Sequence, residues 1–85
     1  MSIRFDHTIV PSTDKEASAR FYEAMLGLPQ GRTEGPFLAL DFGNDVAFYI
    51  AGWDSEVSQQ HYAFLVSDAD FDAIQARLLK RAQDY

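Results

Sequence analysis

A histidine near the start of an apolar, strand-like run occurs twice, and this recurrence constrains the fold more than any other feature. The two runs cover residues 5–10 and 60–66, and their histidines, His7 and His61, stand 54 positions apart. In each copy an acidic residue, Asp14 or Asp68, follows seven positions after the histidine, where a helix is expected to begin. Self-similarity at a fixed offset is typical of an internal duplication, although two short copies can also arise by chance.

The first copy predicts a strand followed by an amphipathic helix. Residues 3–10 alternate in the period of a half-buried strand, which Pro11 is expected to end. Residues 13–16 read as a capping box, with Thr13 at the N-cap and Glu16 reaching back to its amide. Gly27 is a natural stop for this helix. Its apolar residues recur at helical spacing, and we expect one buried stripe of Ala17, Phe21, Ala24, Met25 and Leu28.

The rest of the chain predicts a hairpin, a further strand and a second helix. Residues 30–34 are polar and fit either a short edge strand or a loop, whereas residues 37–42 and 46–51 flank a turn and predict a hairpin. Residues 61–67 are apolar on both faces, which is typical of a central strand. A helix is expected from Asp68 to about Arg81.

Length and composition limit the domain organisation and the class of partner. The chain of 85 residues predicts one α+β domain, with a complete βαβββ module over residues 1–53 and a partial βα module over residues 60–85. The net charge of -6 argues against nucleic acid and anionic membranes as partners. The chain has no cysteine, no signal peptide pattern and no apolar run long enough for a membrane. We therefore expect a cytoplasmic protein.

Two stretches of the sequence resemble a known superfamily. Residues 7–28 read HTIVPSTDKEASARFYEAMLGL, in which Phe21-Tyr22 precedes a helix that ends in Leu26-Gly27-Leu28. This stretch resembles the opening of the vicinal oxygen chelate superfamily, which includes glyoxalase I, bleomycin-resistance proteins and extradiol dioxygenases. HYAFLVSD at residues 61–68 resembles the start of the second module of that family. The resemblance implies a curved mixed sheet built from paired βαβββ modules, and on this expectation the second module is shortened at its C-terminus.

The same resemblance implies a divalent metal on the concave face of the sheet, with His7 and His61 as ligands. Zinc, nickel, iron and manganese all suit imidazole ligands. Metalloenzymes of the family often carry a carboxylate on the last strand of the first module, where this chain has Phe48 and Tyr49. The ligand set in one chain is therefore incomplete. Considered alone, a strand histidine on an apolar face is more often a hydrogen-bonded core residue than a ligand.

Three hypotheses on function follow, and none of them assigns catalytic residues. The first is a metal-dependent lyase, isomerase or dioxygenase acting on a small molecule. The second is a non-catalytic binder of the bleomycin-resistance type, which the missing carboxylate favours. The third is a shortened module that acts through a homodimer, with exchanged elements, because exposed strand edges invite pairing. Aromatic side chains are expected to line the ligand pocket: Phe5, Phe48, Tyr49, Trp53 and Tyr62.

Overall fold

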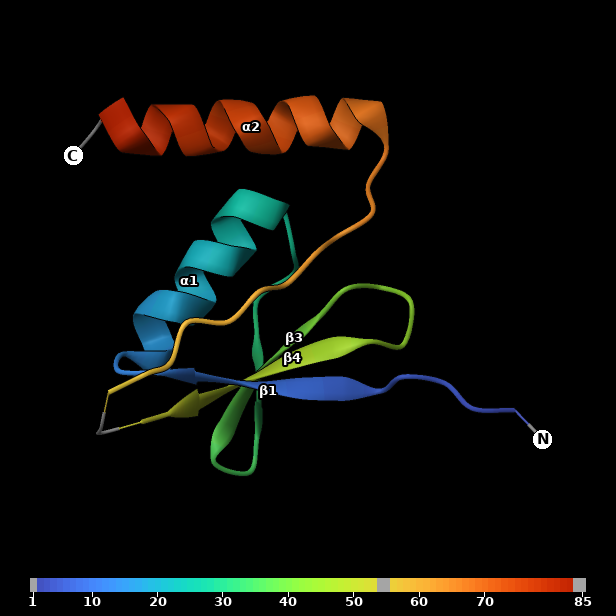
Figure 1. Ribbon diagram of the computed structural model, residues 1–85, viewed down its shortest axis with the longest axis vertical. Helices are drawn as coiled ribbons and strands as arrows, with labels where there is room; N and C mark the ends of the chain where they lie inside the picture. Colours follow the sequence, from blue (N-terminus) through green and yellow to red (C-terminus); the bar gives the residue numbers. More distant parts are fainter. Residues whose placement is uncertain (1, 54–55, 84–85) are drawn as a thin grey trace.

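A four-stranded mixed sheet with a helix against one face forms the centre of the molecule, and this α+β architecture confirms the expected fold class (Figure 1). The structure is a computed structural model, which describes residues 2–53 and 56–83. In chain order the elements are β1 (His7–Ser12), α1 (Lys15–Leu26), β2 (Arg32–Glu34), β3 (Phe37–Asp41), β4 (Ala47–Gly52) and α2 (Asp68–Gln83).

The strands lie in the order β1-β4-β3-β2, so that β1 and β2 are the edges of the sheet. β1 pairs with β4 in parallel, and α1 makes the crossover between β1 and the later strands. β3 pairs antiparallel with β4 and with β2, which confirms the expected hairpin and decides for a short edge strand at residues 32–34. The first copy therefore folds as a complete βαβββ unit.

β1 begins and ends later than the sequence predicts. The ladder with β4 starts at His7 and runs through Pro11 to Ser12, so the expectation that Pro11 ends the strand is wrong. Proline lacks a backbone donor, but it is tolerated on an edge strand whose outer side has no partner in the sheet. Residues 3–5 lie outside the ladder and are exposed.

α1 begins one residue later than the predicted capping box implies. Asp14, not Thr13, is the N-cap, and its carboxylate accepts the amide hydrogen of Ala17 at 3.1 Å. Gly27 ends the helix as predicted, with a φ of 67° that a residue without Cβ adopts at little cost. The predicted stripe is wrong in part: Phe21, Met25 and Leu28 are half-buried, but Ala17 and Ala24 are exposed, and the fully buried residue of α1 is Ala19.

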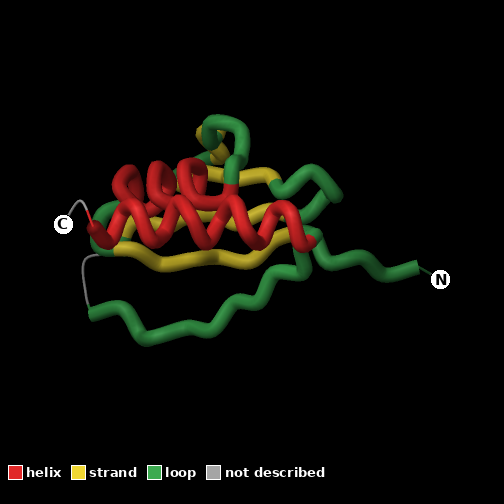
Figure 2. Tube along the Cα trace, turned by 90° about the horizontal axis from the view of Figure 1, so that it is seen from above, coloured by secondary structure: helices red, strands yellow, loops and turns green. Residues whose placement is uncertain are grey.

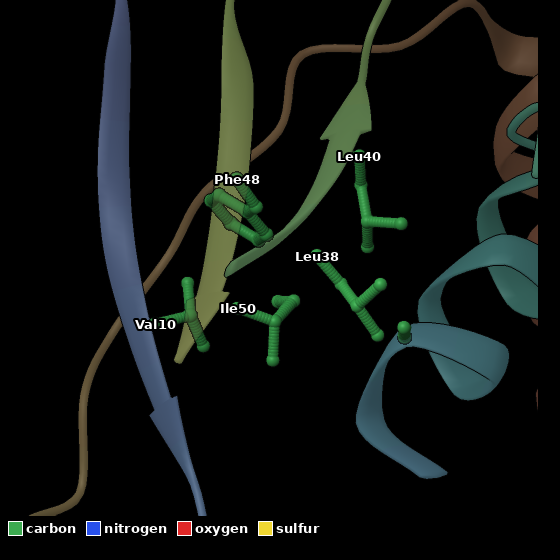
Figure 3. Packing of buried hydrophobic residues seen from close by; sticks show 6 residues of the cluster. Val10, Leu38, Leu40, Phe48 and Ile50 are labelled. Atoms are coloured by element: carbon green, nitrogen blue, oxygen red, sulfur yellow. The ribbon is translucent and has the colours of Figure 1, made fainter. Parts of the chain in front are cut away.

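The hydrophobic core lies between the sheet and α1. Figure 3 shows side chains from β1, β3 and β4 pointing into this layer: Val10, Leu38, Leu40, Phe48 and Ile50. Ala19 of α1 completes the buried cluster, and its small side chain lets the helix approach the strands closely. Residues of these strands with the opposite parity point to the other face of the sheet.

Residues 61–67 were predicted to form a central strand, and that prediction is wrong. The whole segment is loop in Figure 2, and none of its residues joins the ladder of the described sheet. Tyr62 and Phe64 pack against Phe48, with ring centroids 4.8 and 5.6 Å away, whereas Leu65 is fully exposed. The segment is apolar on both faces, but a strand also needs a neighbouring backbone to pair with, and this segment has none among the described strands.

α2 lies against α1 and has no buried residue. Arg77 of α2 donates a hydrogen bond from Nη1 to the carbonyl oxygen of Met25, at the C-terminal end of α1. The guanidinium of Arg81 lies over the ring of Phe21, 5.0 Å from its centroid. Of the helices in the described residues, none has the length and apolar character needed to cross a membrane.

Candidate functional site: the open face of the sheet

The two faces of the sheet differ in what covers them. α1 covers the face that carries Phe48 and Ile50, and we call the opposite face, which carries His7, Tyr49, Arg32 and Asp41, the open face. The register explains this grouping, because residues paired across neighbouring strands point to the same side. His7 pairs with Ala47 and Ala47 with Asp41, so these three residues form one row across the sheet.

Asp6 fixes the imidazole of His7 on the open face. Nδ1 of His7 lies 2.6 Å from Oδ2 of Asp6, and since a carboxylate accepts, Nδ1 carries the hydrogen of this bond. The imidazole stacks on the phenol ring of Tyr49, with centroids 4.0 Å apart and planes 11° apart. With Nδ1 engaged, Nε2 is the nitrogen left for a ligand, a metal or a proton.

Arg32 is held in place on the other side of Tyr49. Its Nε and Nη2 donate to the two carboxylate oxygens of Asp41 at 2.9 and 3.2 Å, and Nη1 also pairs with Glu34. The bond to Asp41, followed by a side-chain hydrogen bond with Tyr49, raises the pKa of Arg32. In return the guanidinium lowers the pKa of Asp41. A bidentate pair of this kind adds geometric specificity to the attraction.

Small residues separate the polar side chains of the open face. Arg32 pairs with Ala39, Ala39 with Tyr49 and Tyr49 with Ile9, which makes a second row across all four strands. Because Ala39 has only a methyl group, nothing larger stands between the guanidinium and the phenol. Ala47 plays the same part in the row of His7 and Asp41. Ala39 and Ala47 are themselves buried, at 1% and 5% exposed, so the accessible surface of the open face is made by the larger side chains beside them, among them His7, Tyr49 and Arg32.

The structure does not bring His61 to His7 within one chain. His61 lines an open groove of about 1060 Å³ on the helix side of the sheet, together with Phe48 of β4 and Ile74 of α2. Tyr62, the next residue, packs on Phe48. Burial raises the pKa of Tyr22 in α1, and the electrostatic interaction with Tyr62 raises it further. His7 is on the open face, where its ring meets Tyr49, which follows Phe48 and points the other way.

The predicted aromatic pocket is divided in the same way. Phe48 and Tyr62 pack together on the helix side, where Phe5 also lines the groove, whereas Tyr49 belongs to the open face. Trp53 follows β4 and is 49% exposed. These five residues therefore do not line one cavity in this chain.

Sequence reasoning missed Asp6, Arg32, Glu34 and Asp41 as members of the site. The alternation of Arg32 and Glu34 was visible, since both would share one face of a short edge strand. Their meeting with Asp41 depends on the register of β2 against β3, which the sequence does not state. In the part of the chain that the structure describes, no group of three histidine, cysteine, aspartate or glutamate residues is placed to hold a metal ion.

Several solved structures are similar to this chain. It shares 44% sequence identity with Oxidase ChaP-H1, with a TM-score of 0.90 over 94% of this chain and 64% of that one. With Oxidase ChaP-H2 the identity is 40% and the TM-score 0.91, over 96% of this chain and 65% of that one. The chain thus spans slightly less than two thirds of the length of either oxidase. An integron cassette protein from the mobile metagenome of V. cholerae shares the fold, at 19% identity and a TM-score of 0.66, over 96% of this chain and 70% of that one. No protein-family model and no curated protein matches the sequence.

Proposed function

We propose that the chain acts in a small-molecule oxidase of the vicinal oxygen chelate kind, with its site on the open face of the sheet. The observation that carries the proposal is the imidazole of His7, oriented by Asp6 on a face that no described element covers. The identity with two proteins named oxidases, 44% and 40%, supports the reaction class. The resemblance of residues 7–28 to the superfamily supports the same assignment.

One chain offers a divalent metal one suitable ligand, His7, but not a complete set of ligands. A carboxylate on one imidazole nitrogen is the usual support for a histidine whose other nitrogen binds metal, and Asp6 provides it for His7. Catalytic zinc usually has three protein ligands, a number that the described residues of one chain do not assemble. A bound metal would supply Lewis-acid chemistry beside His7. In one chain, His7 would offer a metal or a ligand a single imidazole nitrogen oriented by Asp6.

A second copy of the chain would complete the site. The outer edge of β1 is unpaired, and residues 61–67 are extended apolar backbone with no strand partner among the described residues. Unpaired edges of this kind are sites of strand addition and of element exchange between protomers. We propose a homodimer in which this segment of one copy joins β1 of the other, so that His61 of the partner subunit approaches His7.

Mixing two inactive variants tests this assembly. His7→Ala and His61→Ala each remove one histidine from every site of a homodimer. In a mixed dimer one site loses both histidines, whereas the other site keeps both. Random mixing should therefore restore about a quarter of the wild-type metal content and activity. No recovery after unfolding and refolding the two variants together, or a monomer by light scattering at micromolar concentration, would show that the shared site is wrong.

Oxygen consumption tests the reaction class. We would supply the whole chain with Fe²⁺, Mn²⁺, Zn²⁺ or Ni²⁺ and follow oxygen uptake with a panel of small aromatic phenols and ketones. Asp6→Asn should reduce uptake by roughly 10- to 100-fold, since the support of a histidine ligand is worth about that much. Asp45→Asn is the matched control, because Asp45 is an exposed carboxylate that pairs with Arg4. Uptake that is indifferent to both His7→Ala and Asp6→Asn would rule out the open face as the site.

The second candidate function is a non-catalytic binder of the bleomycin-resistance type. The side chain of β4 that faces His7 is the phenol of Tyr49, where a metalloenzyme of the superfamily often has a carboxylate. The two candidates separate by product analysis. A binder retains its aromatic ligand unchanged in the presence of oxygen and metal, whereas an oxidase consumes oxygen in proportion to the ligand lost.

A further inference from the structure

The open face is polar at one end and apolar at the other. His7 and Asp41 lie in one row with Ala47, where β1 and β4 begin and β3 ends. At the opposite end β1 and β4 finish and β3 begins, and the side chains there are Pro11 and Phe37. The alternation of the strands places both of these on the open face. A ligand that lies along the strands therefore meets polar groups at one end only.

Ile9 is a large apolar side chain that the open face leaves in contact with solvent. It is 48% exposed, although it pairs with Tyr49 in the middle of the sheet and stands two positions after His7. Tyr49 is half-buried between its neighbours, with its ring centroid 4.0 Å from that of His7 and 5.7 Å from that of Phe37. An exposed apolar side chain beside an oriented polar group is typical of a small-molecule site.

Trp53 extends the apolar end of the face beyond β4. Its amide donates to the carbonyl oxygen of Ser12 at 2.7 Å, so the backbone stays beside β1 after Gly52. The alternation of the strand then places position 53 on the same side as Tyr49. The indole is also about half exposed. At about 3.3 Å per residue, the surface from position 49 to position 53 is about 13 Å long, which matches one ring with a short side chain.

The area of the open face suits a small molecule better than a protein. The four strands lie about 4.8 Å apart and the longest are about 20 Å long, which gives a flat area of at most roughly 300 Å². A stable protein interface buries about 800 Å² on each partner. The face alone is therefore too small to hold a second protein.

The hydrogen bond with Asp6 decides which polar group His7 can bind. Nδ1 of His7 donates to the carboxylate of Asp6 at 2.6 Å, so in the neutral ring Nε2 carries a lone pair and accepts a hydrogen. A hydroxyl group provides that hydrogen, whereas an ether does not.

We propose that the open face binds a hydroxyl-bearing small molecule in one direction, with the hydroxyl at Nε2 of His7 and an apolar substituent over Ile9 towards Trp53. Ile9 is then a specificity-determining residue, because it provides the surface on which the substituent lies. The inference rests on the proposed function, since it uses the same face. It adds the class of ligand and the direction in which the ligand lies.

Three neutral probes test the two ends of the ligand. 4-Ethylphenol and 4-butylphenol differ by two methylene groups, and 4-butylanisole replaces the hydroxyl of 4-butylphenol with a methyl ether. Calorimetric titration of the whole chain, with EDTA to keep metal ions from Nε2, should show 4-butylphenol binding about 4-fold more tightly than 4-ethylphenol. This corresponds to about 2-fold for each methylene, half-covered by the face. The anisole should bind about 3- to 10-fold more weakly than 4-butylphenol.

Two substitutions separate the ends of the site. Ile9→Thr keeps a β-branched residue in the strand and removes apolar surface. The preference for the butyl over the ethyl compound should then fall below about 2-fold, while the preference for the hydroxyl stays. His7→Ala should do the reverse, abolishing the preference for the phenol over the anisole and keeping that for the longer substituent. Leu79→Ala, at an exposed apolar residue of α2, is the control and should change neither ratio.

Nuclear Overhauser effects give the direction of the bound ligand. The terminal methyl group of 4-butylphenol should lie close to Ile9 and Trp53, and the ring protons beside the hydroxyl close to the imidazole of His7. Contacts of the terminal methyl group with Arg32 would reverse the direction, and contacts with Phe48 would place the phenol on the helix side of the sheet. Either result would overturn the inference.

Equal affinities for the two phenols, in a chain whose binding depends on His7, would overturn this inference and leave the proposed function standing. Binding of neither phenol would also overturn it, and oxygen uptake would then decide separately about the proposed function. A second copy of the chain seated on the face is the other occupant. In that case the phenols would bind more tightly as the chain is diluted, and Ile9→Thr would lower the molar mass measured by light scattering. Both results would count against a small-molecule site.

Discussion

Residues 7–52 and residues 56–83 are built differently, although the sequence presents them as two copies of one unit. The first region has four strands in one ladder and a shared core between the sheet and α1. The second region has a loop where a strand was expected and a helix without a buried residue. Its contacts with the first region include aromatic packing by Tyr62 and Phe64, the hydrogen bond from Arg77, and the guanidinium of Arg81 over the ring of Phe21.

The difference shows that a strand-like sequence becomes a strand only when a partner edge is available. His7 begins a run that meets β4, which the chain itself supplies. The run after His61 is also strand-like but apolar on both faces, and its Tyr62 and Phe64 pack on the helix side of the sheet. The first region is therefore expected to carry most of the stability, and the second to depend on it.

The largest effect should come from the core of the first region. Leu40 is fully buried between β3 and α1, and Leu40→Ala leaves a cavity that should cost about 2–5 kcal/mol of unfolding free energy. Leu79 of α2 is the matched control, since it is 61% exposed and Leu79→Ala should change stability by less than about 0.5 kcal/mol. Urea unfolding with the same chain concentration measures both.

Equal losses from the two substitutions would contradict the comparison. They would mean that Leu79 is covered in solution, as it would be if α2 packed into a second copy. Repeating the titration at several chain concentrations distinguishes these cases, because the stability of a dimer depends on concentration.

A smaller effect should come from the junction where α2 meets the end of α1. Gly27 and Gly35 both have positive φ, 67° and 56°, so alanine at either position should cost about 1–2 kcal/mol. At Gly27 an added Cβ would also lie 3.3 Å from the guanidinium of Arg77, whereas at Gly35 it would meet nothing within 4 Å. Gly27→Ala should therefore be the more costly of the two in thermal unfolding.

The Arg77→Met substitution distinguishes the backbone strain of alanine at position 27 from the close contact of its Cβ with Arg77. If Arg77 ties α2 to α1, the excess cost of Gly27→Ala over Gly35→Ala should shrink in the Arg77→Met background. An excess that persists unchanged would mean that α2 does not hold this position in solution, and that the two regions are more independent than their contact implies.

The sequence predicted those features that depend on neighbouring residues, and it failed where distant residues decide. Gly27 marked the end of α1, and the turn between residues 42 and 46 marked the hairpin, because both depend on local backbone geometry. The stripe of α1 was misplaced because its depth depends on Ala19 meeting the sheet.

The candidate site divides in the same way. His7 was named as a ligand from the family resemblance and Tyr49 as an aromatic pocket residue, but their stacking depends on the parallel register of β1 with β4. Arg32 was missed because its partners, Asp41 and Tyr49, come from two other strands. His61 was paired with His7 by analogy, and the fold of one chain places it on the other side of the sheet.

The smallest effect should be a pH dependence carried by the first region. Burial raises the pKa of Glu23, but the hydrogen bonds that it accepts from the Gly31 amide and from Arg20 outweigh this, and the net shift is downward. A carboxylate with a lowered pKa in the folded state stabilises the protein above its ordinary value of 4.5, and this contribution is lost as the pH falls through the lowered value. Glu23→Gln should therefore cost about 1 kcal/mol of unfolding free energy at pH 7 and progressively less in acid.

Asp72→Asn, in the exposed helix α2, is the control and should change the dependence of the unfolding free energy on pH little. Urea midpoints between pH 7 and 3 provide the measurement. A constant difference between Glu23→Gln and the wild type across that range would mean that the hydrogen bond between Glu23 of α1 and Gly31, just before β2, does not depend on charge.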